Sequence, residues 1–345
     1  MTGRERVRRC LEFDYPDRVP RDLWLLPIAE HEHGRAAIAD FQRRWPIDFD
    51  RPAVPNPKLA ALTEGDPYAV GRYRDEWGCV FENVQPGVIG QVKHPPLDDW
   101  SKLDTLRLPV EVLDIDRAAI DAACAASDRF VLSGCCPRPF ERLQFLRGTE
   151  AVFRDLVREP PELHELLRRI HDLNCREIEV WCRTRVDGIT FMDDWGSQEN
   201  SLISPRQWRR LFKPLYADYV RIARAAGKKA FMHSDGHIFA IYEDLIEIGV
   251  DAINSQLFCM DLAQIAARFA GRITFWGEVD RQHVLPAPSP AAARNAVRQL
   301  VELLYRPAGG VIAQFELGAG AKLANADAAF RAWEELTGGG RTEPG

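Results

Sequence analysis

The sequence predicts an α/β fold, namely a (β/α)8 TIM barrel that spans residues 1–345 as one domain with an irregular insertion capping one end. Three observations favour it. Short, almost continuously apolar segments alternate with amphipathic ones, which is typical of a parallel sheet covered by helices. Many of the apolar segments end in acidic or amide residues. The alternative, a doubly wound open sheet, usually carries a glycine-rich phosphate loop, and the sequence has none.

Seven strands and the helices between them can be assigned in order, leaving one strand of the barrel unassigned. The predicted strands are residues 18–26, 129–136, 188–194, 228–235, 250–258, 272–280 and 309–317. The predicted helices are 141–157, 162–182, 204–227, 238–249, 261–271 and 290–304. Several of these helices have proline near the first turn and glycine at the end, the asymmetry expected of helix termini.

Residues 34–105 differ from the rest of the chain, because they are rich in proline, glycine and aromatic residues and show little helical period. We expect them to form a lid with a few antiparallel strands over one end of the barrel. A separate domain is the alternative. The glycine-rich tail, residues 337–345, is expected to be disordered.

Charge and composition exclude several classes of protein. The net charge is −6, and the basic residues are dispersed, which argues against a surface for nucleic acid or anionic membranes. No apolar run is long enough to span a bilayer, and no signal peptide is visible. The eight cysteines include no CxxC pair and indicate reduced thiols in a cytoplasmic protein.

Polar residues at the ends of the predicted strands indicate an active site, since the carboxyl ends of barrel strands line the catalytic face. Buried carboxylates are costly unless they are paired, protonated or bound to a metal, so this acidic mouth favours an enzyme. The residues concerned are Cys135, Cys136, Asp193, Asp194, His233, Asp235, Asn254, Gln256, Glu278, Asp280 and Glu316. We expect Asn254 and Gln256 to bind substrate.

The segment "HSDGH", residues 233–237, contains the central histidine of this mouth. Positions i and i+2 of a strand point to the same side, so His233 and Asp235 are expected to project together. Gly236 argues against a helical pair of histidine ligands, which leaves His237 a looser role near the substrate. The alternative is that His233 is only a hydrogen-bonded histidine at the end of a strand.

Two further blocks supply candidate catalytic and binding groups. Adjacent strand residues face opposite sides, so one of Asp193 and Asp194 should face the site, while Gln198 and Trp195 could contact substrate. The alternative is a turn that only caps a helix. Glu278, directly after a predicted strand, is a candidate base or ligand. Its alternative is a solvated loop in which Arg281 pairs with Asp280.

Four blocks of the chain, "GITFMDDWGSQENSLISPRQWRRLFKP", "GKKAFMHSDGHIFAIYEDLIEIGVDAINSQ", "RITFWGEVDRQHVLP" and "GGVIAQFELGAGAKLANADAAF", occur in an order that resembles the uroporphyrinogen decarboxylase superfamily. The N-terminal blocks "RERVRRCLEFDYPDRVPRDLW" and "RYRDEWGCVFENVQPGVIGQVKHP" resemble its corrinoid-methyltransferase and demethylase-like branch. The resemblance implies a (β/α)8 barrel with its site at the C-terminal face. The arginine-rich motif by which true decarboxylases bind polycarboxylates is absent, because only Arg18 and Arg21 occupy that stretch.

The resemblance also implies a metal site and a partner. The zinc methyltransferases of the superfamily bind the metal through a His-x-Cys pair and a later cysteine; the matching positions here are His233, Asp235 and Glu316. Carboxylates in place of thiolates suit zinc acting on an oxygen substrate. The corrinoid would be carried by a separate partner protein, and a homodimer is implied as well.

Three functions are consistent with these residues. The first is a metal-dependent methyltransferase or O-demethylase that moves a methyl group between a small molecule and a separate corrinoid protein. The second is a metal-free decarboxylase or lyase of a small non-porphyrin substrate in the same pocket, with Asp194 and His233 as acid–base groups. The third is a small-molecule binding barrel without catalytic activity.

Overall fold

The computed structural model describes residues 1–338, and its largest sheet has six strands that all run parallel. Neighbouring strands follow the order β1 (Arg21–Leu25), β11 (Val311–Leu317), β10 (Thr274–Trp276), β9 (Ala252–Ser255), β8 (Lys229–Ser234) and β7 (Gly188–Met192). Each lies within a predicted strand segment. The carboxyl ends of the six strands therefore meet at one edge, where the sequence predicts the site.

A second, two-stranded parallel sheet pairs β2 (Phe49–Asp50) with β6 (Phe130–Val131). The amide of Asp48, next to β2, donates to the carbonyl of Arg21 in β1 at 2.8 Å. Ser133, just beyond β6, donates to Gly188 in β7 at 2.9 Å. Both end strands of the large sheet thus lie beside this pair, so the large sheet must curl. The expected α/β fold with a curled parallel sheet is confirmed, but the strands form two separate ladders instead of one.

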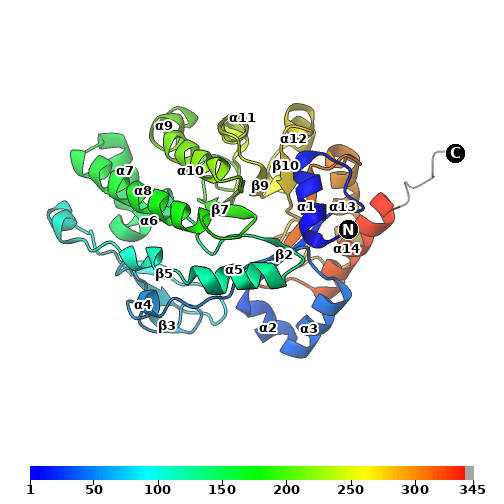
Figure 1. The fold of residues 1–345 in the computed structure, drawn as a ribbon, viewed down its shortest axis with the longest axis horizontal. Coiled ribbons are helices and arrows are strands. Elements are labelled where there is room, and N and C mark those ends of the chain that lie inside the picture. The colour runs from blue at the N-terminus through cyan, green and yellow to red at the C-terminus, as the bar shows by residue number, and fades with distance from the viewer. Residues whose placement is uncertain (339–345) are drawn as a thin grey trace.

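Helices alternate with these strands along the chain and cover the outside of the sheet (Figure 1). Residues 141–157 form two helices because Gly148, with φ of +86°, separates them, and residues 204–227 divide near Pro214. The helices are α1 (Gly3–Glu12), α2 (Pro27–His33), α3 (Arg35–Arg44), α4 (Pro57–Ala60), α5 (Arg117–Ala126), α6 (Pro139–Arg147), α7 (Thr149–Arg158), α8 (Pro161–Cys182), α9 (Pro205–Leu211), α10 (Lys213–Ala225), α11 (Tyr242–Ile248), α12 (Leu262–Phe269), α13 (Ala291–Leu304) and α14 (Leu323–Thr337), with 3-10 turns η1 (Trp100–Thr105), η2 (Val110–Leu113), η3 (Phe239–Ile241) and η4 (Leu257–Cys259).

The N-terminal insertion contains the expected antiparallel strands, β3 (Gly71–Arg74), β4 (Val80–Asn83) and β5 (Gln91–His94). It lies at one side of the molecule near α6 and α8, opposite both termini (Figure 1). The expected range 34–105 also includes the helix α3 and the strand β2, which pairs with the barrel strand β6. The predicted tail, 337–345, starts with the last residue of α14, and residues 339–345 lie outside the described part of the chain.

The inside of the curled sheet is filled by apolar side chains, which form the floor under the mouth. These residues are Val7, Cys10, Leu11, Phe49, Phe130, Leu132, Phe231, Ala252, Trp276 and Ile312. A larger cluster joins the outer face of the sheet to the helices. Within residues 1–338, no helix combines the length and the hydropathy that crossing a bilayer requires.

Candidate metal and acid–base site

Three of the predicted polar residues meet where β7 and β8 end. His233 is the fifth residue of β8 and only 5% exposed, while Asp194 and Asp235 follow the ends of β7 and β8. One ligand atom from each of these three side chains lies within 4.8 Å of the other two. The sequence expectation that His233 and Asp235 project together agrees with this arrangement. Asp194, expected among the catalytic groups, completes the trio.

The imidazole of His233 is held by Asn254 of the neighbouring strand β9. The amide nitrogen of Asn254 donates to the carbonyl of Trp276 at 2.5 Å and to Oε1 of Gln314 at 2.9 Å. Its oxygen therefore faces Nδ1 of His233, 2.6 Å away, and must accept the proton of that nitrogen. This assignment leaves Nε2 facing the two aspartates, where its lone pair could bind a metal or, when protonated, the nitrogen could donate to a carboxylate. Asn254, expected to bind substrate, instead orients the histidine.

The two aspartates present oxygen atoms to that lone pair. Nε2 of His233 lies 3.6 Å from Oδ1 of Asp194 and 3.5 Å from Oδ1 of Asp235. The latter oxygen is buried and takes part in no hydrogen bond within residues 1–338. Buried polar atoms are normally satisfied, so an oxygen of this kind indicates a missing ligand. One imidazole nitrogen and two carboxylates form a donor set that suits zinc and similar divalent metals.

Two glycines set the spacing of these aspartates. Gly196 follows Asp194 by two positions and Gly236 follows Asp235 directly, and their backbones touch. A Cβ atom on Gly236 would lie 2.1 Å from the carbonyl oxygen of Gly196, and one on Gly196 would lie 2.2 Å from the amide nitrogen of His237. Gly236 also has φ of +78°, a conformation that favours glycine. The two loops can approach this closely only because both residues lack side chains.

A single guanidinium group lies among the remaining acids of the mouth. Arg281 forms an ion pair with Oδ2 of Asp235, and its other nitrogens lie 3.6 Å from Glu278 and 3.5 Å from Glu316. Burial raises the pKa of Glu316, while Arg281 lowers it in part. Glu316, expected as a metal ligand, is thus paired with an arginine and is not a member of the trio around His233.

Glu278 is the most deeply buried acid of the mouth, with 2% of its surface exposed. Neither of its carboxylate oxygens has a hydrogen-bond partner among the described residues. Burial raises its pKa to about 8, with Asp235, Glu316 and Asp280 adding to the shift and Arg281 opposing it. Glu278 is therefore mostly protonated at neutral pH. A carboxylic acid in that state can donate a proton, and its conjugate base can recover one.

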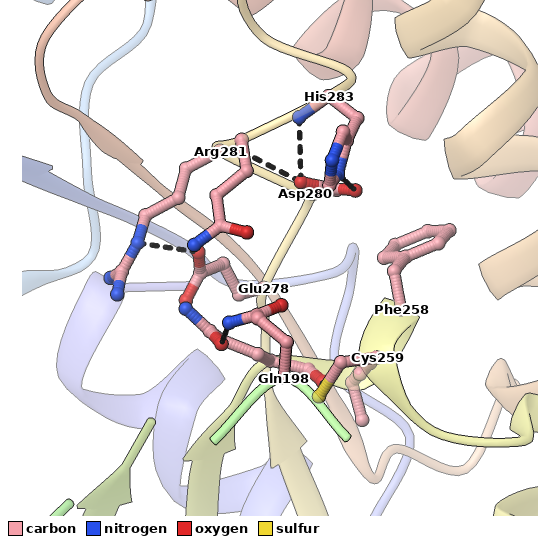
Figure 2. A pocket seen from close by; sticks show the side chains of 10 residues that line it. Gln198, Phe258, Cys259, Glu278, Asp280, Arg281 and His283 are labelled. Carbon is pink, nitrogen blue, oxygen red and sulfur yellow. Dashed lines mark hydrogen bonds and ion pairs between the residues drawn. The ribbon is translucent and has the colours of Figure 1, made fainter. Parts of the chain in front are cut away.

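A pocket of about 150 Å³ leads to Glu278 and Arg281 (Figure 2). Phe258 and Cys259 lie on one side of it, and Gln198 lies beside Glu278. Nε2 of Gln198 donates to Oε1 of Gln256 at 2.7 Å, so two of the expected substrate-binding residues do meet in this pocket. The half-buried side chain of His237 is not part of its lining.

Asp193 and Trp195 face away from the mouth. Asp193 is fully buried and accepts the backbone amides of Phe140 at 2.9 Å and Glu141 at 2.7 Å, which cap α6. It also accepts the hydroxyl of Tyr216 at 2.5 Å. The ring of Trp195 stacks on Phe140 with centroids 4.2 Å apart and is 1% exposed. Of the two adjacent aspartates, Asp194 is therefore the one that faces the site, and Asp193 has the helix-capping role weighed as the alternative.

Sequence reasoning missed two arginines. Arg281 was weighed only as a partner of Asp280, but Asp280 instead pairs with His283 at 3.0 Å. Arg138 lies near the mouth and makes only a loose ion pair, 3.8 Å from Glu141. Burial lowers the pKa of its guanidinium, but the nearby acids Glu141, Asp193 and Asp194 help to raise it above the ordinary value. An acid-rich mouth requires compensating cations, so the sequence does indicate that arginines should lie there. It does not indicate which arginines, because the acids that contact them are distant in sequence.

Comparison with known proteins places these features in a family. A sequence model described as uroporphyrinogen decarboxylase (URO-D) matches residues 76–335. The fold is similar to that of a methyltransferase from Methanosarcina mazei, with a TM-score of 0.66, 15% identity, and coverage of 97% of this chain and 99% of that one. It is also similar, with a TM-score of only 0.40 and 12% identity, to a 3-keto-D-glucoside 4-epimerase, YcjR, from E. coli, covering 71% of this chain and 96% of that one. No curated protein matches the sequence. Since the family match spans most of the described residues, the chain belongs to the uroporphyrinogen decarboxylase family.

Proposed function

We propose that the protein is a metal-dependent methyltransferase or O-demethylase that moves a methyl group between a small molecule and a separate corrinoid protein. The family match and the fold shared with the methyltransferase from Methanosarcina mazei support this proposal. The observation that carries it is the free lone pair of His233 directed at Asp194 and Asp235. An imidazole nitrogen and two carboxylate oxygens that converge in this way form a donor set suited to a divalent metal.

We assign the metal to Asp194, His233 and Asp235. Zinc bound there would polarise a substrate oxygen and so stabilise the oxyanion that leaves when a methyl group is removed. Asn254 keeps the proton of His233 on Nδ1, and such partners of ligand histidines strengthen metal binding. Glu316 remains a candidate for a further ligand.

The other groups of the mouth would handle the substrate and its proton. Glu278, protonated at neutral pH because burial raises its pKa to about 8, would hold the proton that an oxyanion product needs. Gln198 and Gln256 offer amide donors and acceptors at the rim of the pocket. His237 would contact the substrate from near this rim. The corrinoid protein would dock over the same mouth, because the methyl group must pass between the two proteins.

Metal analysis of the purified, untagged protein tests this assignment. We expect about one zinc per chain after zinc is supplied and the excess removed, and its loss in His233→Ala and Asp235→Ala. His237→Ala is the matched control, since this histidine lies in the same segment and outside the trio. Absence of metal from the parent protein, or equal loss in the control, would contradict the assignment.

Arg281 favours a second candidate, a metal-free decarboxylase or lyase. Its guanidinium already neutralises Asp235 and approaches Glu278 and Glu316, so these acids have a counter-ion without a metal. Arg281→Met separates the two candidates. If the arginine is the resident counter-ion of a metal-free site, the variant loses substrate binding; if a metal is bound, the variant keeps its metal.

We also propose that the two parallel ladders close into one barrel of eight strands. The hydrogen bonds from Asp48 to Arg21 and from Ser133 to Gly188 join the pair β2–β6 to both end strands of the large sheet. If the barrel is closed, the amides of Asp48 and Ser133 should exchange with deuterium as slowly as those inside the large sheet.

A further inference from the structure

A cavity of about 390 Å³ lies between the insertion and the barrel body, apart from the mouth pocket. The insertion supplies Tyr68, Tyr73 and Phe81, while α6 and α8 supply Phe145 and Glu177. Aromatic rings thus form much of the wall, and the ring centroids of Tyr73 and Phe81 lie 5.9 Å apart. The volume is that of a small-molecule site.

This wall already accommodates one cation. The guanidinium of Arg142 lies 4.8 Å from the ring centre of Trp77 and 5.4 Å from that of Phe145. Arg142 forms ion pairs with Asp75 at 2.6 Å and with Glu76 at 3.5 Å. Ring faces attract cations through their quadrupole, and one guanidinium shared by two acids leaves this part of the cavity short of positive charge.

Glu177 is the acid that remains without a partner. Its side chain borders the cavity, and within residues 1–338 it makes neither a hydrogen bond nor an ion pair. Burial, together with the negative charge of Glu76, raises its pKa to about 8. Beside it, Asn174 donates its amide nitrogen to the hydroxyl of Tyr219 at 3.0 Å, which leaves its carbonyl oxygen as an acceptor. This end of the cavity therefore presents acceptor oxygens from both Glu177 and Asn174.

We propose that this cavity binds a small organic ammonium ion with apolar substituents. The positive charge would lie at Glu177, the acid that lacks a counter-ion, and the substituents would lie against Tyr73 and Phe81. Hydrogen atoms on the ammonium or on its adjacent carbons would face the oxygen of Asn174. This site is separate from the metal trio, so the inference does not rest on the proposed function.

An anion fits the cavity less well. Its acids are Asp75, Glu76 and Glu177, against the guanidinium groups of Arg142 and Arg138. Arg142 is already paired, and Arg138 belongs to the side of the mouth, since Glu141, Asp193 and Asp194 contribute to the raised pKa of its guanidinium. A ligand carboxylate would therefore lie beside the unpaired carboxylate of Glu177, and like charges in a partly buried site repel strongly.

Isothermal titration of the full chain with three small probes tests the proposal at pH 9, because burial raises the pKa of Glu177 to about 8 and the side chain is a carboxylate only above that pH. Benzyltrimethylammonium should bind, benzyl alcohol should bind at least about tenfold more weakly, and benzoate should bind most weakly of the three. Glu177→Gln should weaken binding of the ammonium probe about tenfold, because it removes the charge while keeping the shape. Tyr73→Leu should also weaken it. Glu179→Gln, on the exposed face of the same helix, is the matched control and should bind like the parent.

The outcomes are distinct. Binding of benzoate as tight as that of the ammonium, no ammonium binding at all, or equal affinities in Glu177→Gln and Glu179→Gln would each overturn the proposal. Asp235→Ala should bind the ammonium probe like the parent. If it does while the parent holds no zinc, the cavity proposal stands and the metal assignment fails.

Discussion

At the scale of single residues, the orientation of His233 is set by Asn254, whose own orientation is fixed by two groups that do not contact the histidine. Asn254 could accept or donate toward the imidazole, but its amide nitrogen is already used by Trp276 and Gln314. Its oxygen must therefore face Nδ1, so Nε2 is the ring nitrogen that faces Asp194 and Asp235. The buried side chain of Asn254 thus determines which nitrogen of His233 faces the two aspartates.

Replacement of that amide should weaken the metal site. Asn254→Leu keeps the volume but frees the imidazole, so zinc affinity should fall about 10–100-fold. A competition titration against a chromophoric chelator measures this, with Asn200→Leu at an exposed position as control. Unchanged affinity in Asn254→Leu would show that His233 is oriented in some other way.

The acid form of Glu278 should limit turnover at alkaline pH. Its pKa is raised to about 8 mainly by burial, so the group is protonated below that pH and ionised above it. A step that needs its proton should slow as pH rises through about 8. The pH profile of kcat/KM should decrease above about pH 8 in the parent, and this alkaline limb should be absent in Glu278→Gln. A limb that persists in the variant belongs to another group.

At the scale of elements, the turn after β7 uses two adjacent aspartates for different purposes. Alternation along a strand sends Asp193 toward α6 and Asp194 toward the mouth. Asp193 satisfies two amides at the first turn of α6 and the hydroxyl of Tyr216, so it ties a strand to two helices. Asp194 has 39% of its side chain exposed and accepts a single hydrogen bond, from the amide of Asp235 at 3.0 Å, so the fold depends on it less.

The two aspartates should therefore differ in their effect on stability. Asp193→Ala leaves two amides and a hydroxyl unsatisfied in the interior, and we expect a loss of about 3–5 kcal/mol in the free energy of unfolding. Asp194→Ala should cost below about 1 kcal/mol. Denaturant unfolding followed by circular dichroism compares them. Similar losses for both would contradict the division of roles.

The sequence predicted these elements unevenly, for physical reasons. The strands of the large sheet were recognisable because each is a continuous apolar run. The two residues of β2 carry no such pattern, since a strand this short takes its pairing from its neighbours. Alternation required Asp193 and Asp194 to diverge, but the choice between them depended on where α6 begins. The ion pair of Arg281 with Asp235 joins two loops 46 residues apart and left no local signal.

At the scale of the whole molecule, Arg142 is one of the arginines that join the insertion to the barrel helices, together with Arg147 and Arg169. Arg142 of α6 reaches Asp75 at 2.6 Å and covers the ring of Trp77. Asp75 is buried, and its other oxygen accepts the amides of Trp77 and Cys79. Composition set this region apart from the rest of the chain, but it did not predict that α3 and β2 lie outside the antiparallel sheet. The cavity beneath it was not predictable, because segments around residues 70 and 177 enclose it jointly.

Loss of this contact should loosen the insertion as a unit. Arg142→Ala leaves the carboxylate of Asp75 buried without a counter-ion, which costs about 3–5 kcal/mol. Limited proteolysis should then cut between residues 57 and 94 before the barrel is cleaved. Arg72→Ala, which removes an exposed pair with Glu82, should behave like the parent protein. Cleavage distributed evenly along the chain would show that the insertion is held by other contacts.

The contact between Gly196 and Gly236 has a consequence for how this protein can diverge. Side chains are forbidden at both positions, because each would strike the other's loop, so the distance between Asp194 and Asp235 is inherited through the backbone. The exposed residues that follow, from Ser197 to Asn200, carry no such constraint. Substitutions between Ser197 and Asn200 can therefore change the rim that contacts a substrate, while the two glycines keep the spacing of the two carboxylates constant.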